Sequence, residues 1–157
     1  MASWVFSLRI VGALLLAGGA GSWASGATAP ADPCTLLTAA AVSQATGATY
    51  NPPHASVAPR PFANTAQGTD CRYEGGGDQL LFRIYFDPSA ADATSLFARL
   101  KMFFGTPTAV SGIGDEAYLD ERGALHARKG NVRYYLEMGE NKAAQIKALG
   151  SLVAGEL

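Results

Sequence analysis

The sequence predicts an α+β fold, an antiparallel sheet of about five strands with helices packed on one face, in two layers. Three observations support this prediction. Residues 79–86 and 132–138 alternate between apolar and polar side chains, as half-buried strands do. Each segment is followed by apolar residues at helical spacing, within 89–104 and 141–153. Because strands followed by a helix occur twice, we expect a pseudo-repeat whose strands join into one sheet.

The first half begins with a helix, predicted over 36–45, where apolar residues recur at helical spacing. Thr38 is placed to cap this helix, and Gly47 is placed to end it. The next segment, 51–69, is rich in Pro, Ala and Thr. Such a composition is typical of a long surface loop.

Two strands are then expected at 71–74 and 79–86. They flank a Gly-Gly-Gly-Asp sequence, which favours a hairpin turn because glycine tolerates positive φ. The following helix is expected to open at Pro88 or Ser89 and to end at Gly105. Its predicted buried stripe consists of Ala93, Leu96, Phe97, Leu100 and Phe104.

The second half is predicted to hold strands at 117–119, 125–128 and 132–138, with a two-residue hairpin turn at Gly130 and the asparagine after it. A closing helix follows, with Asn141 as its expected N-cap. Its predicted buried stripe consists of Ile146, Leu149, Leu152 and Val153. Together with the first half, these elements complete the single sheet.

The second face of this sheet is the candidate functional surface. It is expected to be open to solvent or to a partner, and its predicted residues are Arg83, Tyr85, Arg133, Tyr135 and Glu137. Tyrosine and arginine often anchor interfaces. We therefore take Arg83, Tyr85, Arg133 and Tyr135 as candidate binding residues for a protein or a small ligand, here or in a cleft under the 51–69 loop. The alternative is a solvated face with ordinary cross-strand pairs.

The N-terminus predicts export. Arg9 precedes an apolar run over 10–17, and small residues follow. This pattern is typical of a secretory signal peptide, here over 1–27, with cleavage near Ala24 or Ala27. The apolar run spans about a dozen residues, fewer than the roughly 20 of a spanning helix, although a retained N-terminal anchor stays as the alternative.

The chain after cleavage, 28–157, is expected to form one extracytoplasmic domain without a stable membrane anchor, in the periplasm or secreted. Its two cysteines, Cys34 and Cys71, are expected to form a disulfide, because an exported chain with one pair most simply closes one bridge. The 12 basic and 13 acidic residues leave a net charge of −1, which disfavours nucleic acid as a partner.

The segment 112–117 formally fits the Gly-x-Gly-x-x-Ala dinucleotide fingerprint. A strand is expected after it, whereas the fingerprint needs a helix there, so no cofactor is predicted. We expect a tight turn in which Gly112 and Gly114 take positive φ and Asp115 accepts from backbone amides. Metal binding is not predicted either, since adjacent acids on a strand point to opposite faces and the two histidines lack a third ligand.

No nucleophile elbow, phosphate loop or Cys-His pattern is present in the sequence. We therefore expect a non-catalytic binding module. The alternative is an envelope hydrolase with a dispersed site, in which Asp115 or Glu116 acts with His126.

Three motifs resemble a known family: Asp-Pro-Cys-Thr-Leu-Leu-Thr at 32–38, Cys-Arg-Tyr at 71–73, and Val-Ser-Gly-Ile-Gly-Asp-Glu-Ala-Tyr at 110–118. Together they are similar to the DUF3558-like family of small bacterial secreted and lipoprotein domains of unknown function. The resemblance implies an envelope or secreted protein without established catalytic residues. Two departures stand out: no lipobox precedes the domain, and Ala41 stands where a glutamate often completes a capping box.

Overall fold

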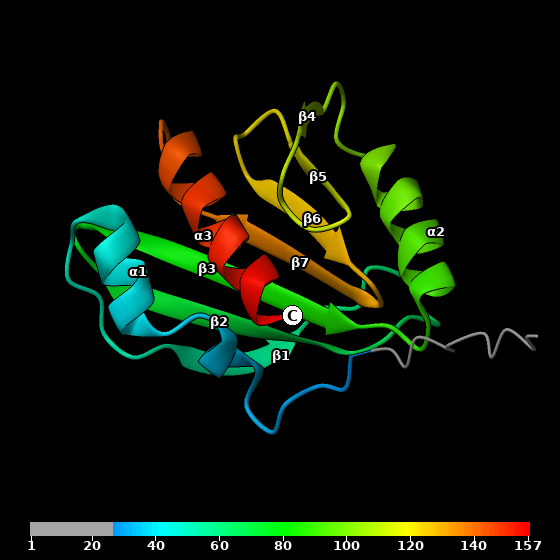
Figure 1. The fold of residues 1–157 in the computed structure, drawn as a ribbon, viewed down its shortest axis with the longest axis horizontal. Coiled ribbons are helices and arrows are strands. Elements are labelled where there is room, and N and C mark those ends of the chain that lie inside the picture. Colours follow the sequence, from blue (N-terminus) through cyan, green and yellow to red (C-terminus); the bar gives the residue numbers. More distant parts are fainter. Residues whose placement is uncertain (1–26) are drawn as a thin grey trace, which may run out of the picture.

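The computed structural model describes residues 27–157, so nearly all of the predicted signal segment 1–27 lies outside the described residues. Within 27–157 the chain forms one seven-stranded antiparallel sheet with strand order β1-β2-β3-β7-β6-β5-β4 (Figure 1). The strands are β1 (His54–Ala58), β2 (Gly68–Gly75), β3 (Asp78–Phe86), β4 (Thr108–Val110), β5 (Glu116–Leu119), β6 (Leu125–Lys129) and β7 (Val132–Glu137). The helices are a 3-10 turn η1 (Pro33–Leu36) and the α-helices α1 (Ala39–Thr46), α2 (Ala90–Lys101) and α3 (Ala143–Glu156).

Two meanders build the sheet, one from β1 to β3 and one from β4 to β7. They meet at its centre, where β3 pairs with β7 and Phe82 lies opposite Leu136. The α+β class and the repeated order of strands followed by a helix are as predicted. The sheet has seven strands rather than about five, because β1 and β4 were not predicted.

The prediction of a loop over 51–69 was wrong in part, because β1 and the start of β2 lie within it. Both unpredicted strands are the outermost strands of the sheet. Four of the five β1 residues are exposed, so the strand shows no alternation of buried and exposed positions. Strand β1 is held in the sheet by its backbone pairing with β2. Backbone pairing requires no alternation of apolar and polar side chains, so the sequence pattern does not reveal this strand.

The larger apolar core lies between one face of the sheet and the helices α1 and α3, which lie side by side (Figure 1). Helix α3 approaches β6 closely at Gly150, where a Cβ would meet the Leu125 side chain at 2.2 Å. Tyr134 Oη donates to the Gly150 carbonyl oxygen at 2.8 Å. The buried strand and helix residues of this core include Leu80, Phe82, Ile84, Leu125, Val132, Leu136, Ile146 and Leu149.

Helix α2 packs on the opposite face, so the predictions of helices on one face and of a wholly open second face were wrong. Its buried Phe97 packs against Tyr118 of β5 with ring centroids 5.1 Å apart, and Tyr118 stacks on His126 of β6. A helical stripe shows which side of a helix is buried. It carries no information about which face of a sheet receives that side.

The predicted disulfide is present between Cys34 of η1 and Cys71 of β2, with Cα atoms 5.5 Å apart. Both cysteines are buried. The Tyr73 hydroxyl beside the bridge donates to the Leu37 carbonyl oxygen. The start of the described chain is therefore bonded to the sheet at two neighbouring points.

The predicted caps of α1 are confirmed: Thr38 Oγ1 accepts from the Ala41 amide at 3.2 Å, and Gly47 has φ 75°. Ser89 caps α2, as one of the two predicted alternatives. The prediction for α3 was wrong, because its N-cap is Lys142, without a side-chain hydrogen bond.

The predicted buried stripe of α3 needs one correction, because Leu152 is 45% exposed, whereas Ile146, Leu149 and Val153 are buried. The side of α3 that faces the sheet is centred on Gly150, whose missing side chain permits the close approach to β6. None of the helices within residues 27–157 has the length and hydrophobicity needed to cross a membrane.

Candidate functional site

A pocket of about 210 Å³ lies on the second face of the sheet, and we call it the α2-face pocket. The central strands form its floor, α2 forms one wall, and the connection between β1 and β2 forms another. Its lining residues are Pro59, Arg60, Pro61, Arg83, Tyr85, Phe97, Leu100, Phe104, Arg122, His126, Arg133, Tyr134 and Tyr135.

All four candidate binding residues from the sequence line this pocket. Arg83 pairs with Tyr135 and Tyr85 pairs with Arg133 across β3 and β7, so the four side chains form two adjacent Arg-Tyr pairs. The Arg133 Cζ lies 4.8 Å from the centre of the Tyr85 ring, and the Arg83 Cζ lies 5.9 Å from the centre of the Tyr135 ring. Glu137, predicted on the same face, lies outside the pocket lining.

Arg83 is positioned by a buried carboxylate on β2. Its Nε donates to Asp70 Oδ1 at 2.6 Å and its Nη2 donates to Asp70 Oδ2 at 2.9 Å. These bonds raise the pKa of Arg83 above its ordinary value, and burial opposes them. The guanidinium therefore stays charged, with its plane set by the two-point contact.

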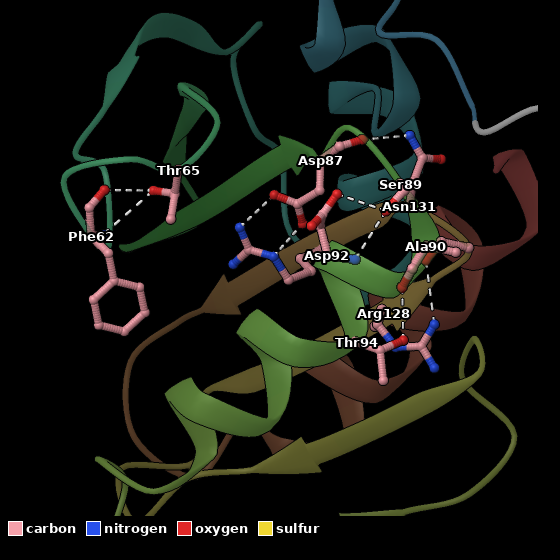
Figure 2. Close-up of polar contacts among 11 residues, drawn as sticks. Phe62, Thr65, Asp87, Ser89, Ala90, Asp92, Thr94, Arg128 and Asn131 are labelled. Atoms are coloured by element: carbon pink, nitrogen blue, oxygen red, sulfur yellow. Dashed lines mark hydrogen bonds and ion pairs between the residues drawn. The ribbon is translucent and has the colours of Figure 1, made fainter.

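Arg133 makes a second two-point contact, with Asp87 at the end of β3. Nη2 donates to Asp87 Oδ1 at 2.9 Å and Nε donates to Oδ2. Asn131 Nδ2 donates to the Asp87 carbonyl oxygen at 2.9 Å. Figure 2 shows Asp87 between Asn131 and the first turn of α2, where Ser89 and Asp92 form the cap. Asp87 thus joins the pocket floor to the start of the helix that covers it.

His126 is held by Asp120, with 3.2 Å between Nε2 and Oδ2. Its ring lies 4.3 Å from that of Phe104 and 4.8 Å from that of Tyr135. Burial lowers the pKa of His126, although the hydrogen bond to Asp120 acts in the opposite direction. Burial therefore favours the neutral form of the imidazole. Sequence reasoning missed Asp120, because it lies in a turn outside every motif.

The connection between β1 and β2 is fixed to the pocket by few contacts. Tyr85 Oη donates to the Pro59 carbonyl oxygen at 2.7 Å. The Phe62 ring lies under the Arg99 guanidinium, 3.7 Å from its Cζ, and packs against Phe103. Thr65 Oγ1 donates to the Phe62 carbonyl oxygen and closes a turn (Figure 2). The 51–69 segment therefore forms one wall of the α2-face pocket, which lies where the sequence predicted a cleft. The contact of Phe62 with Arg99 was not predicted.

The glycine turn lies elsewhere. Gly112 and Gly114 have φ of 80° and 60°, and Asp115 Oδ2 accepts from the Gly130 amide at 2.8 Å and from Arg128 Nη1 at 2.9 Å. A Cβ at Gly114 would meet the Arg128 carbonyl oxygen at 2.4 Å, so this position requires glycine. The tight turn expected from the sequence is present.

The carboxylates proposed for a hydrolase do not meet the histidine. Asp115 binds Arg128, and Glu116 binds Lys101 Nζ at 3.2 Å, whereas the partner of His126 is Asp120. No group of three or more metal-ligating side chains occurs within the described residues. Among residues 27–157, no Ser, Thr or Cys lines the α2-face pocket.

Comparison with known proteins identifies a shared fold. The chain is similar to the crystal structure of the extracellular domain of PknH from Mycobacterium tuberculosis, with a TM-score of 0.56 and 10% sequence identity. The match covers 83% of this chain and 96% of that domain. No family model matches the chain, and no curated protein matches it either.

Proposed function

We propose that this protein is an exported, non-catalytic binding module, whose α2-face pocket takes a small ligand. The observation that carries the proposal is the pocket itself, in which charged and aromatic side chains from β3, β6, β7 and α2 converge on one cavity. Binding sites are typically concave and largely apolar, with a few well-placed polar groups. The α2-face pocket has an apolar wall and a few charged side chains in its lining.

Three observations support export. The sequence pattern over 1–27 is typical of a signal peptide. Cys34 and Cys71 form a disulfide, a bond that persists in oxidising compartments. The fold is shared with an extracellular domain. We propose the periplasm or secretion as the location, and we retain the DUF3558-like resemblance as a proposal.

The α2-face pocket suits a small molecule better than it suits the flat surface of a partner protein. Arg133 and Tyr85 are almost fully buried, so a partner protein could not cover them as a surface patch. A hydrolase with a Ser, Thr or Cys nucleophile is disfavoured, because the lining residues in the described part of the chain include none of these beside His126. These two points favour binding of a small molecule without turnover.

The experiment is a fragment titration followed by ¹H–¹⁵N NMR on the exported protein, in the wild type and in Leu100→Trp. The indole is expected to fill the pocket, because Leu100 lines it. Fragments are expected to shift the amides of Tyr85 and His126 with a Kd on the order of 1 mM. Leu100→Trp should abolish these shifts.

The matched control is Leu96→Trp, on the same helix but outside the pocket lining, which should leave the shifts intact. Binding that survives Leu100→Trp, or a complete lack of shifts at pocket residues in the wild type, would refute the pocket as a ligand site. Loss of binding in both variants would show damage to α2 rather than occupation of the pocket, and the site would then be tested by competition between fragments.

A further inference from the structure

We propose that the ligand is a small organic anion, with its oxyanion head beside Arg83 and Arg133 and a flat apolar body against Phe97, Leu100 and Phe104. This inference rests on the proposed function, because it specifies the chemical class of ligand for the same pocket. Three features support it: the layering of charge, the unpartnered guanidinium nitrogens and the aromatic wall.

Charge around the pocket forms two layers. Among the described residues, the inner layer, which lines the cavity, holds four arginines and no Asp or Glu: Arg60, Arg83, Arg122 and Arg133. The carboxylates of Asp70 and Asp87 bind the two central arginines and are themselves 3% and 2% exposed. The positive member of each ion pair therefore faces the cavity, an arrangement that favours an anion over a cation.

Each central arginine keeps one nitrogen free. Arg83 and Arg133 bind their carboxylates through Nε and Nη2, so the Nη1 atom of each arginine takes no part in its ion pair. Among residues 27–157, two side-chain polar atoms are both fully buried and without a hydrogen-bond partner, Tyr118 Oη and Arg128 Nε. The Nη1 atoms of Arg83 and Arg133 are not among them, so neither Nη1 is closed off from the cavity.

The two free donors belong to neighbouring positions of the sheet. Arg133 lies opposite Tyr85, two residues along β3 from Arg83, so the arginines are diagonal neighbours on one face. Guanidinium hydrogen bonds to charged oxygens are about twice as strong as bonds between neutral groups. The proposed oxyanion lies beside both arginines and leaves their contacts with Asp70 and Asp87 in place.

The rest of the lining is apolar and limits the size of the ligand. Phe97, Leu100 and Phe104 supply a wall from α2 and the residues after it. The volume of about 210 Å³ is somewhat larger than that of an engineered cavity of about 150 Å³ that binds benzene. The space suits one ring with a short acidic arm.

Four probes that share one ring test the charge preference: phenylacetate, phenyl phosphate, phenylacetamide and 2-phenylethylamine. Each is titrated into the exported protein and followed by ¹H–¹⁵N NMR. Phenylacetate is expected to shift the amides around Arg83, Arg133 and Phe97, and to bind at least about tenfold more tightly than the neutral amide. The ammonium probe is expected to leave these amides unshifted.

Each outcome has a distinct meaning. Tighter binding of phenyl phosphate than of phenylacetate supports the anion site and identifies phosphate as its preferred head group. Equal binding of phenylacetate and phenylacetamide in the pocket overturns the anion proposal and leaves the proposed function intact. If none of the four probes and no fragment of any charge shifts the pocket amides, both proposals fail.

A variant pair tests the charge of the pocket while both central ion pairs, Arg83 with Asp70 and Arg133 with Asp87, stay in place. Arg122→Gln removes an exposed lining arginine and should weaken phenylacetate binding about twofold. Lys147→Gln removes an exposed cation of α3, on the other face of the sheet, and should leave binding unchanged. Weakening in Arg122→Gln alone supports the proposal, whereas equal behaviour of the two variants contradicts it.

Discussion

The two faces of the sheet are stabilised in different ways. The face under α1 and α3 is an apolar core whose residues come from β3, β6, β7 and both helices, with the Cys34–Cys71 bridge at one end. The face under α2 buries two arginine-aspartate pairs, a histidine and several aromatic rings, and it contains the pocket. A closed apolar core tolerates no vacant space, whereas buried ion pairs hold side chains at fixed positions around a cavity.

This difference separates stability from function within one sheet. Alternate residues of β3 and β7 point to opposite faces, so Ile84 and Tyr134 contribute to the core while Tyr85 and Arg133 contribute to the pocket. Substitutions on the α1 and α3 face should act on unfolding alone. Substitutions on the α2 face should act on binding, and on unfolding only where an ion pair is buried.

The largest expected effect is that of Asp87→Ala. Arg133 would keep its charge in a buried position without its partner, so we expect a loss of roughly 3 to 5 kcal/mol in the free energy of unfolding. Urea denaturation of the two proteins measures this loss. Leu149→Ala, in the core of the other face, serves as a benchmark with an expected loss of roughly 2 to 5 kcal/mol. A loss below about 1 kcal/mol for Asp87→Ala would show that solvent in the pocket replaces Asp87 as the partner of the Arg133 guanidinium.

The disulfide gives the next effect, on the α1 and α3 face. Replacing both Cys34 and Cys71 by Ala opens a loop of sequence separation 37, which the loop-closure model values at roughly 4 kcal/mol. Measured values for disulfides are typically 2 to 4 kcal/mol, so a drop in this range is expected on urea denaturation. The pocket amides should keep their NMR positions in this variant. Shifts there would show that the two faces are coupled.

The smallest expected effect is the pH dependence that His126 contributes on the α2 face. Its pKa in the folded protein lies below the ordinary 6.5, because burial penalises the imidazolium more than Asp120 favours it. Below pH 6.5 the unfolded chain therefore binds a proton that the folded protein excludes. Stability falls as the pH drops from 6.5 to the folded-state pKa and then levels off with respect to this group.

Urea denaturation at a series of pH values tests this, with His126→Gln beside the wild type. The difference between the two curves reports the contribution of His126 together with its contact to Asp120. His126→Gln should lose less stability than the wild type on acidification through this window. His54→Gln, at an exposed position of β1, should follow the wild-type curve. Parallel curves for all three proteins would mean that His126 is not desolvated.

Local sequence patterns predicted the elements that bury a face. The alternation in β3 and β7, the cap at Thr38 and the glycines of the turns depend on interactions within a few residues, and the structure has each of them. The edge strands β1 and β4 were missed, because they are short or exposed and are held by backbone pairing. The candidate residues Arg83, Tyr85, Arg133 and Tyr135 were found because alternation assigns them to one face.

The sequence by itself determined the α+β class, the central strands, the helices and the set of side chains on each face, because periodicity and turn chemistry act over a few residues. Only the tertiary structure decided that α2 covers the second face, and that Asp70, Asp87 and Asp120 pair with Arg83, Arg133 and His126. These pairs join residues from different elements. Their geometry depends on how the elements pack, and no local pattern records it.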